Sequence, residues 1–113
     1  MYRIKTEVTI SAAHKLNLPY ESPCKEVHGH NWKIAVIMQS RQLTNGMVLD
    51  FTSVKKFIKD KFDHKTINDI IEQPTAENIA KYIFDELNYL STDATCEKVE
   101  VQETEGNYAS YEI

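Results

Sequence analysis

Apolar and polar residues alternate along the first part of the chain. Four apolar residues share one parity there: Tyr2, Ile4, Val8 and Ile10. Charged residues occupy most of the other parity, and a period of two with one polar face predicts a strand of an antiparallel sheet. The pattern recurs from His30 to about Ser40, so a second strand is predicted there. Because the connecting segment 17–26 contains Pro19 and Pro23, we expect an irregular excursion and not a tight hairpin.

Two helices are predicted in the middle of the chain. From Thr52 to Phe62 the apolar residues fall at helical spacing, and lysines occupy much of the remaining surface. A second helix is expected to begin at residues 74–77, with Thr75 as its N-cap and Glu77 near the positive end of the helix dipole. Its buried stripe is predicted to consist of Ile79, Ala80, Ile83, Phe84 and Leu87.

Two further strands are predicted after the helices. Val99 and Val101 alternate with polar residues, and the segment from Tyr108 to Ile113 follows the turn residues 105–107. The element order is therefore ββααββ. We expect an α+β fold in which a helix pair covers one face of a four-stranded antiparallel sheet, within a single domain spanning residues 1–113.

Composition and charge narrow the function classes. The 113 residues carry 13 Lys+Arg and 17 Asp+Glu, a formal charge of −4, and have no basic cluster, which argues against nucleic acid as a partner. No apolar run approaches the roughly 20 residues that span a bilayer, and the first residues lack the apolar block of a signal peptide. The two cysteines, Cys24 and Cys96, are too few for a disulfide framework. We expect a cytoplasmic protein with reduced thiols.

Three of the four histidines suggest a metal site. In His28-Gly29-His30 the two imidazoles point to the same face of an extended chain. If the first two strands pair antiparallel, His14 at the end of the first strand lies beside them. Three neutral imidazoles suit a zinc ion whose fourth position is open, the arrangement of a catalytic site. A His-x-His pattern alone has no such meaning, so the interpretation depends on His14.

Other side chains could act beside a metal. Cys24 lies on an irregular polar segment and is a candidate base or nucleophile, whereas Cys96 is interpreted as a small buried apolar residue. Asp63 could orient His64, although a histidine at a helix C-terminus is also stabilised by the helix dipole alone. Glu103 continues the apolar parity of the strand, where its carboxylate needs a partner. It could accept two hydrogen bonds from a guanine or pterin edge; a slip in register is the alternative.

Together these residues resemble the family of 6-pyruvoyltetrahydropterin and 6-carboxytetrahydropterin synthases. The resemblance runs in family order through six stretches: Ser11–His14, Cys24–His30, Val48–Phe51, Phe62–Asp69, Pro74–Asn78 and Val101–Thr104. The Cys-x-x-x-His-Gly-His element is the most specific of them. The family's tunnelling fold, with ββααββ order, agrees with the fold predicted from periodicity.

The resemblance implies a role for each matched residue. It implies that His14, His28 and His30 hold zinc, and that Cys24 abstracts a proton with Asp63 and His64 as acid–base partners. It further implies that Glu103 anchors a pterin ring, which Thr75 and Ala76 contact through their backbone with Glu77 nearby. The implied substrate is 7,8-dihydroneopterin triphosphate.

The resemblance also implies a reaction and an assembly. The carboxy branch of the family makes 6-carboxy-5,6,7,8-tetrahydropterin for queuosine synthesis, and the pyruvoyl branch feeds tetrahydrobiopterin synthesis; the short chain favours the carboxy branch. A zinc-stabilised binding or assembly module without catalysis is the alternative from another class. A chain this small has little material to enclose a pocket. The family's solution is a homohexamer of two stacked trimers, in which sheets join into a barrel and active sites are shared between subunits.

Overall fold

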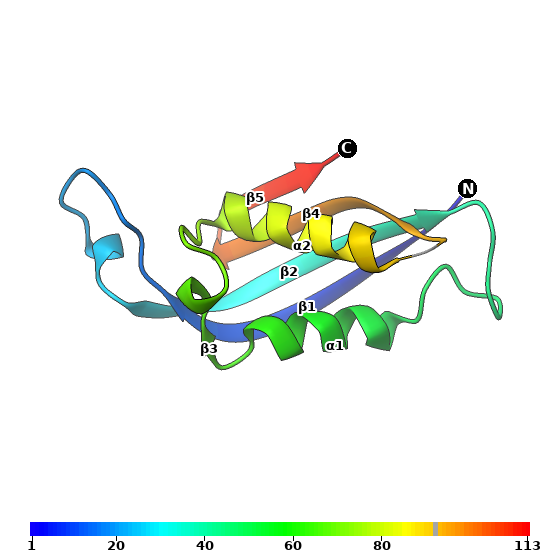
Figure 1. Cartoon of the computed structure of the whole chain (residues 1–113), viewed down its shortest axis with the longest axis horizontal. Coiled ribbons are helices and arrows are strands. Elements are labelled where there is room, and N and C mark those ends of the chain that lie inside the picture. Colours follow the sequence, from blue (N-terminus) through cyan, green and yellow to red (C-terminus); the bar gives the residue numbers. More distant parts are fainter. Residues whose placement is uncertain (92) are drawn as a thin grey trace.

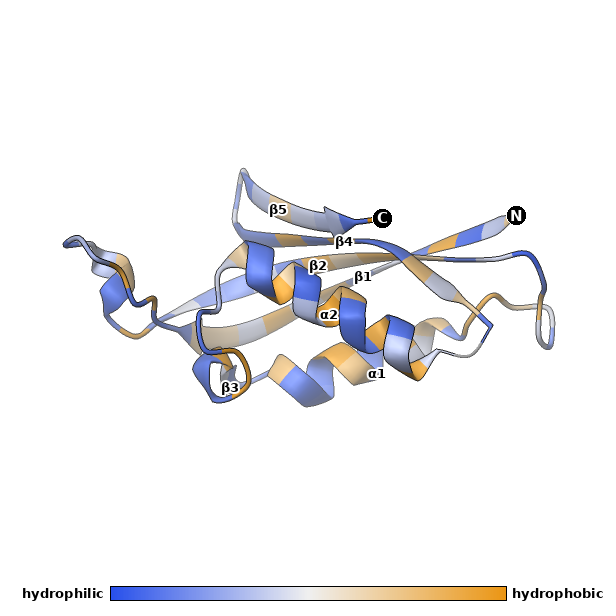
Figure 2. Cartoon of the chain, turned by 45° about the horizontal axis from the view of Figure 1, so that its top comes forward, coloured by the Kyte–Doolittle hydropathy of each residue, from blue (hydrophilic) through white to orange (hydrophobic). Residues whose placement is uncertain are grey.

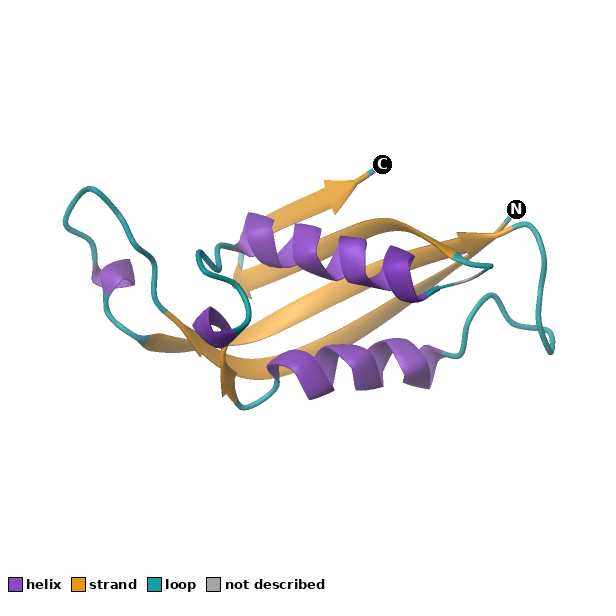
Figure 3. Cartoon of the chain, viewed as in Figure 1, coloured by secondary structure: helices purple, strands orange, loops and turns teal. Residues whose placement is uncertain are grey.

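The computed structural model describes residues 1–91 and 93–113 and shows a sheet with two helices on one of its faces (Figure 1, Figure 3). The strand order is β3-β1-β2-β4-β5. Antiparallel pairing joins the four long strands, which are β1 (Tyr2–His14), β2 (His28–Ser40), β4 (Thr95–Thr104) and β5 (Asn107–Glu112). These four strands and the two helices confirm the predicted α+β architecture.

The helices α1 (Phe51–Phe62) and α2 (Ala76–Leu90) turn their apolar stripes toward the sheet (Figure 2). Each helix is preceded by an N-cap residue whose side chain accepts a hydrogen bond from a backbone N–H of the first turn. Asp50 accepts from Thr52, and Thr75 accepts from Asn78, as predicted for Thr75. These caps satisfy amides that have no partner within the helix, so they fix where each helix begins.

Side chains of one parity along β1 and β2 form the core under the helices. Ile10 and Ile34 are buried there, and each buried side chain of this size contributes about 1.5–3 kcal/mol. Trp32 is fully buried, and its indole N–H donates to the Ala12 carbonyl at 3.0 Å. The same parity continues to His14, which has no exposed surface although it is polar. The other face of the sheet carries charged side chains such as Lys5.

Three short elements were not predicted. A two-residue strand, β3 (Lys65–Thr66), pairs parallel to β1, so the sheet is not wholly antiparallel. The 3₁₀ turns η1 (Pro23–Lys25) and η2 (Ile67–Asp69) lie in the connecting segments. Elements of two or three residues are too short for a hydrophobic pattern to repeat, which is why periodicity does not reveal them.

The topology brings the predicted site to one end of the sheet (Figure 1). At that end β1 and β4 finish, β2 and α2 begin, and α1 ends. The outer edge of β5 and most of the edge of β1 have no strand partner within the described residues. No helix in the described part of the chain has both the length and the apolar content needed to cross a bilayer.

Candidate metal centre and active site

The β1–β2 register places three histidines together, as the antiparallel pairing predicted. His14 faces His28 directly across the two strands, and Ala12 faces His30. The Nε2 atoms of His14 and His28 are 3.0 Å apart, and one ring nitrogen from each of the three histidines lies within 4.8 Å of the others. The cluster could therefore hold one metal ion.

Hydrogen bonds to carbonyls fix the orientation of two of these rings. The Nδ1–H of His14 donates to the Pro74 carbonyl at 2.8 Å, and the Nδ1–H of His28 donates to the Glu26 carbonyl at 2.7 Å. A carbonyl can only accept, so each neutral ring carries its proton on Nδ1. Both Nε2 atoms consequently present lone pairs, and this is how a metal-binding imidazole is usually held.

The three free nitrogens fit a cation. Two Nε2 lone pairs that face each other at 3.0 Å repel unless a positive charge lies between or beside them. The third nitrogen, Nε2 of His30, is buried without a hydrogen-bond partner in the described residues. Three imidazole donors are a typical set for zinc with one position open, so the residues present fit this ion.

Burial affects the protonation of the cluster. Removal from water lowers the pKa of His14 below its ordinary value, although the Pro74 carbonyl and the Glu103 carboxylate act in the opposite direction. Burial also lowers the pKa of His30, again against the effect of Glu103. Both rings therefore stay neutral, and able to bind metal, to lower pH than an exposed histidine does.

These lowered pKa values predict that the metal-free protein loses stability in mild acid. The unfolded chain takes up protons near the ordinary histidine pKa of 6.5, whereas the native rings take them up only at lower pH. The stabilisation is therefore complete above about pH 6.5 and falls as the pH drops toward the native pKa values. Urea unfolding between about pH 8 and pH 5.5 should show a smaller decline for His30→Gln, because glutamine does not titrate.

The control for this experiment is His64→Gln, whose side chain is 81% exposed in the wild type. It should keep the pH dependence of the wild-type free energy of unfolding. If the free energy of unfolding declined equally for the wild type and His30→Gln, a lowered pKa of His30 would not be the cause of the acid sensitivity.

Glu103 lies on the side of β4 predicted from its parity. Its carboxylate oxygens are 3.8 Å from Nε2 of His14 and 3.6 Å from Nε2 of His30. The β4–β5 register shifts between Gln102 and Thr104, so the strand carries a bulge at Glu103. A bulge re-aims a side chain, and here the carboxylate is directed to the rim of the histidine cluster.

A hollow of about 360 Å³ lies beside Glu103. The predicted substrate residues Thr75, Ala76 and Glu77 line one side of it, and Asn107 and Tyr108 line another. The start of α2 and the β4–β5 turn thus form a site at the cluster's rim. The four residues predicted to bind substrate therefore lie around one hollow.

Cys24 and the Asp63–His64 pair lie at different places around this end of the chain. Cys24 belongs to η1, on the excursion that projects beyond the sheet (Figure 1). Asp63 accepts the Ser11 N–H at 2.9 Å, and His64 adopts a left-handed backbone with φ of 59° that turns its ring outward. No hydrogen bond or ion pair joins Cys24 to either residue among those that the structure describes.

His64 instead lines a shallow hollow together with residues of β1 and β2, among them Ser11, Gly29, His30 and Asn31. One chain does not assemble the predicted thiol, acid and base into one set.

Sequence reasoning missed the groups that orient the metal ligands. The carbonyls of Pro74 and Glu26 have no side-chain signature. The available signal was position, because Glu26 lies two residues before His28, and Pro74 lies directly before the predicted N-cap Thr75.

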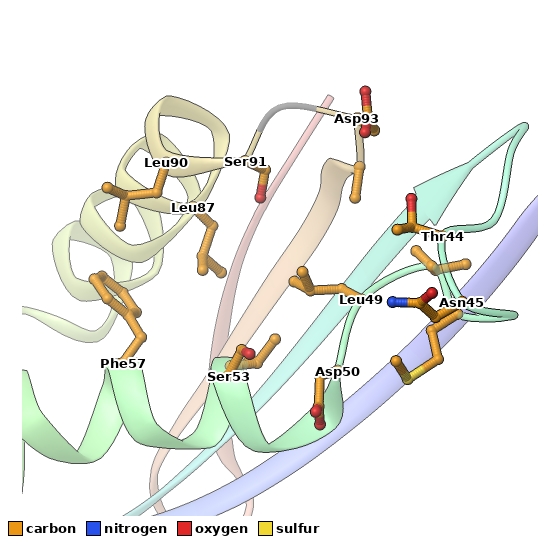
Figure 4. A pocket seen from close by; sticks show the side chains of 14 residues that line it. Thr44, Asn45, Leu49, Asp50, Ser53, Phe57, Leu87, Leu90, Ser91 and Asp93 are labelled. Atoms are coloured by element: carbon orange, nitrogen blue, oxygen red, sulfur yellow. The ribbon is translucent and has the colours of Figure 1, made fainter.

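A further cavity lies away from the histidine cluster. It has a volume of about 440 Å³ and lies between the C-terminal half of α2, the start of α1 and the loop before it (Figure 4). Leu49, Phe57 and Leu87 supply apolar walls, and Asp50 lies at the rim. It contains no histidine or cysteine and none of the predicted site residues.

The chain matches known proteins along nearly its whole length. The family model for 6-pyruvoyl tetrahydropterin synthase matches residues 3–113. A protein of Archaeoglobus fulgidus, provisionally assigned as a 6-carboxy-5,6,7,8-tetrahydropterin synthase, is 38% identical over 109 residues, 94% of this chain and 91% of the relative. The 6-carboxy-5,6,7,8-tetrahydropterin synthase of Synechocystis sp. is 34% identical over 122 residues, 98% of this chain and 93% of the relative.

A solved structure shares the fold. The 6-pyruvoyl tetrahydropterin synthase of Caenorhabditis elegans superposes with a TM-score of 0.78 at 27% sequence identity, covering 99% of this chain and 95% of that chain. This match confirms the predicted fold class.

Proposed function

The chain belongs to the 6-pyruvoyl tetrahydropterin synthase family, and from this premise we propose that it is a zinc-dependent lyase that converts 7,8-dihydroneopterin triphosphate to 6-carboxy-5,6,7,8-tetrahydropterin. The observation that carries the proposal is the convergence of three histidine ring nitrogens beside Glu103 and the hollow at the start of α2. The queuosine pathway is the corresponding physiological context.

His14, His28 and His30 would hold the zinc ion. A bound zinc would supply Lewis acidity at the substrate's side chain, which makes neighbouring C–H and O–H groups more acidic. The carbonyls of Pro74 and Glu26 hold two of the imidazoles in the ligating tautomer before any metal arrives. The burial of His14 keeps that ring neutral, so little proton release opposes metal binding near neutral pH.

Glu103 would anchor the pterin. Its two carboxylate oxygens can accept the paired N–H groups of a pterin edge, while the backbone at Thr75 and Ala76 contacts the ring. This arrangement would leave the substrate's side chain toward the histidine cluster, because Glu103 lies between the hollow and the cluster.

Cys24 would take a proton from the substrate, and His64, oriented by Asp63, would return one. Asp63 Oδ2 lies 3.6 Å from Nε2 of His64. Since Cys24 and His64 are not joined within one chain, we propose that the pair comes from a neighbouring subunit.

The neighbouring subunit also explains the open strand edges. We propose that the free edges of β1 and β5 pair between copies, which closes a trimer into a barrel, and that two trimers stack as a hexamer. Sizing chromatography with light scattering should give a hexamer or a trimer. A fully active monomer would contradict a shared site.

Glu103→Ala separates an anchoring role from metal ligation. We expect the zinc content to remain and kcat/KM to fall by at least about 10-fold, since a hydrogen bond to a charged group contributes about 1.5–3 kcal/mol. Elemental analysis and steady-state kinetics measure the two effects. Loss of zinc from Glu103→Ala would instead make this carboxylate a metal ligand.

Product analysis tests the proposed function. The zinc-loaded protein is incubated with 7,8-dihydroneopterin triphosphate, and the products are resolved by chromatography and mass spectrometry. We expect 6-carboxytetrahydropterin with acetaldehyde and free triphosphate. The alternative product, 6-pyruvoyltetrahydropterin, corresponds to the name of the C. elegans protein. If neither product nor triphosphate release appears, the enzyme proposal fails and a non-catalytic zinc-stabilised module replaces it.

A further inference from the structure

Two side-chain amides hold the chain just after His14. Asn68 Oδ1 accepts the Lys15 N–H at 2.9 Å, and Asn68 Nδ2 donates to the Lys15 carbonyl at 2.9 Å. Gln73 does the same for Asn17, with Oε1 accepting its N–H at 2.9 Å and Nε2 donating to its carbonyl at 3.0 Å. The facing residue of an antiparallel strand makes this pair of bonds, so the amides prolong the sheet edge where β1 has ended.

Leu16 lies between Lys15 and Asn17, and its backbone N–H points away from the Asn68 and Gln73 side chains. Its N–H donates to the Cys24 carbonyl at 2.7 Å. Backbone groups alternate in direction along an extended chain, so fixing Lys15 and Asn17 also fixes the direction of the Leu16 N–H. Within its own turn, Ser22 Oγ accepts the Cys24 N–H at 3.2 Å. The Leu16 bond therefore ties the thiol-bearing turn to the segment that leaves β1, while the Glu26 carbonyl at the end of the turn accepts the Nδ1–H of His28 on β2.

Gln73 also contacts the other parts of the candidate site. Its carbonyl accepts the Asn78 Nδ2 at 2.9 Å and the Thr75 N–H at 2.9 Å, which attaches it to the start of α2. The next residue, Pro74, accepts the Nδ1–H of His14. The segment from Gln73 to Thr75 thus touches a candidate metal ligand, the segment that leads to Cys24 and the rim of the substrate hollow.

We propose that Asn68 and Gln73 are positioning residues that set where the Cys24 thiol lies relative to the histidine cluster. The proposal rests on the catalytic role given to Cys24 under the proposed function. The excursion from Lys15 to Val27 contains no strand or α-helix. Without the hydrogen bonds from Asn68 and Gln73, we expect the Cys24 thiol to sample many positions. A displacement of about 1 Å in a reacting group can cost roughly 10²-fold in rate.

The test compares Gln73→Ala and Asn68→Ala with Gln42→Ala, a control in the exposed loop at the far end of the sheet. Zinc content, kcat and KM are measured, together with the rate at which iodoacetamide alkylates Cys24, located by peptide mass spectrometry. Burial raises the pKa of the Cys96 thiol to about 11, so alkylation reports on Cys24. We expect kcat to fall by about 10-fold to 100-fold, with zinc content unchanged, KM nearly unchanged and a severalfold change in alkylation rate.

A double substitution shows whether the effect passes through the thiol. In a Cys24→Ala background, Gln73→Ala should cost little further activity, because residues that act as a unit are not additive. Gln73→Glu keeps the size of the side chain and the acceptor for the Asn17 N–H but loses the donor, so it should show a smaller alkylation change than Gln73→Ala. It also serves as the test variant if the alanine form does not fold.

Three results would overturn the proposal. They are loss of zinc in step with kcat, an alkylation rate equal to that of Gln42→Ala, or an undiminished effect of Gln73→Ala in the Cys24→Ala background. The alkylation comparison needs no turnover. If the wild type does not act on the pterin triphosphate, the proposed function fails while the positioning of Cys24 is still decided.

Discussion

Replacing His28 with alanine is expected to remove the metal and the activity together. The substitution deletes one of three converging ring nitrogens and leaves Nε2 of His14 without its neighbour at 3.0 Å. Loss of a group that merely orients a ligand weakens metal binding by about 10–100-fold, and loss of the ligand itself should exceed that. Elemental analysis after dialysis should find the protein nearly free of zinc, with turnover at the limit of detection.

Thermal unfolding provides a second measure of the same loss. A ligand that binds only the native state at 100 times its Kd adds about 2.7 kcal/mol to stability. The wild type should therefore gain thermal stability with zinc, whereas His28→Ala should gain almost none. His64→Ala is the matched control, because this exposed histidine lies outside the cluster and its loss should leave zinc binding intact. Full zinc retention by His28→Ala would contradict the proposal that His14, His28 and His30 hold the ion.

Cys24→Ala is expected to separate metal binding from chemistry. The variant should bind zinc as the wild type does, because the candidate metal cluster found in the described residues comprises His14, His28 and His30 and does not include Cys24. Its turnover should fall by about 10²–10⁴-fold, which is the usual contribution of a general base. Zinc content and single-turnover kinetics on the same preparation measure both quantities.

Cys96→Ala is the matched thiol control. Cys96 is fully buried under the helices, and its sulfur lies 3.8 Å from the Lys98 carbonyl. Its replacement should lower stability through lost packing and leave kcat unchanged. Zinc loss from Cys24→Ala would contradict the proton-abstracting role and make that thiol a metal ligand.

The sequence predicted the long elements because their patterns are long. Ile10 and Trp32 each belong to an alternation of several residues, and Thr75 carries a side chain that caps a helix. The prediction ended the first strand at Ile10, although β1 continues to His14. Small and polar residues occupy residues 11–14, so alternate positions there do not differ in hydrophobicity enough to indicate a strand.

The sequence predicted the parts of the candidate site that strand pairing brings together. It did not predict the parts that depend on contacts between loops. Antiparallel pairing placed His14 beside His28, and parity placed Glu103 on the same face. The amide contacts of Asn68 and Gln73 join segments more than fifty residues apart through side chains that look ordinary in sequence. Cys24 and His64 are not joined within one chain, and the proposed meeting of the two across subunits has no counterpart in the pattern of a single chain.

The burial of Trp32 against the histidine cluster gives the protein an intrinsic optical reporter. Its ring centroid lies 4.8 Å from that of His14 and 5.3 Å from that of His30, and it is the only tryptophan in the chain. Indole emission responds to charge placed close to the ring, so occupation of the cluster by a cation should change its intensity and wavelength. Metal uptake, release and exchange could then be followed by fluorescence in real time without a label.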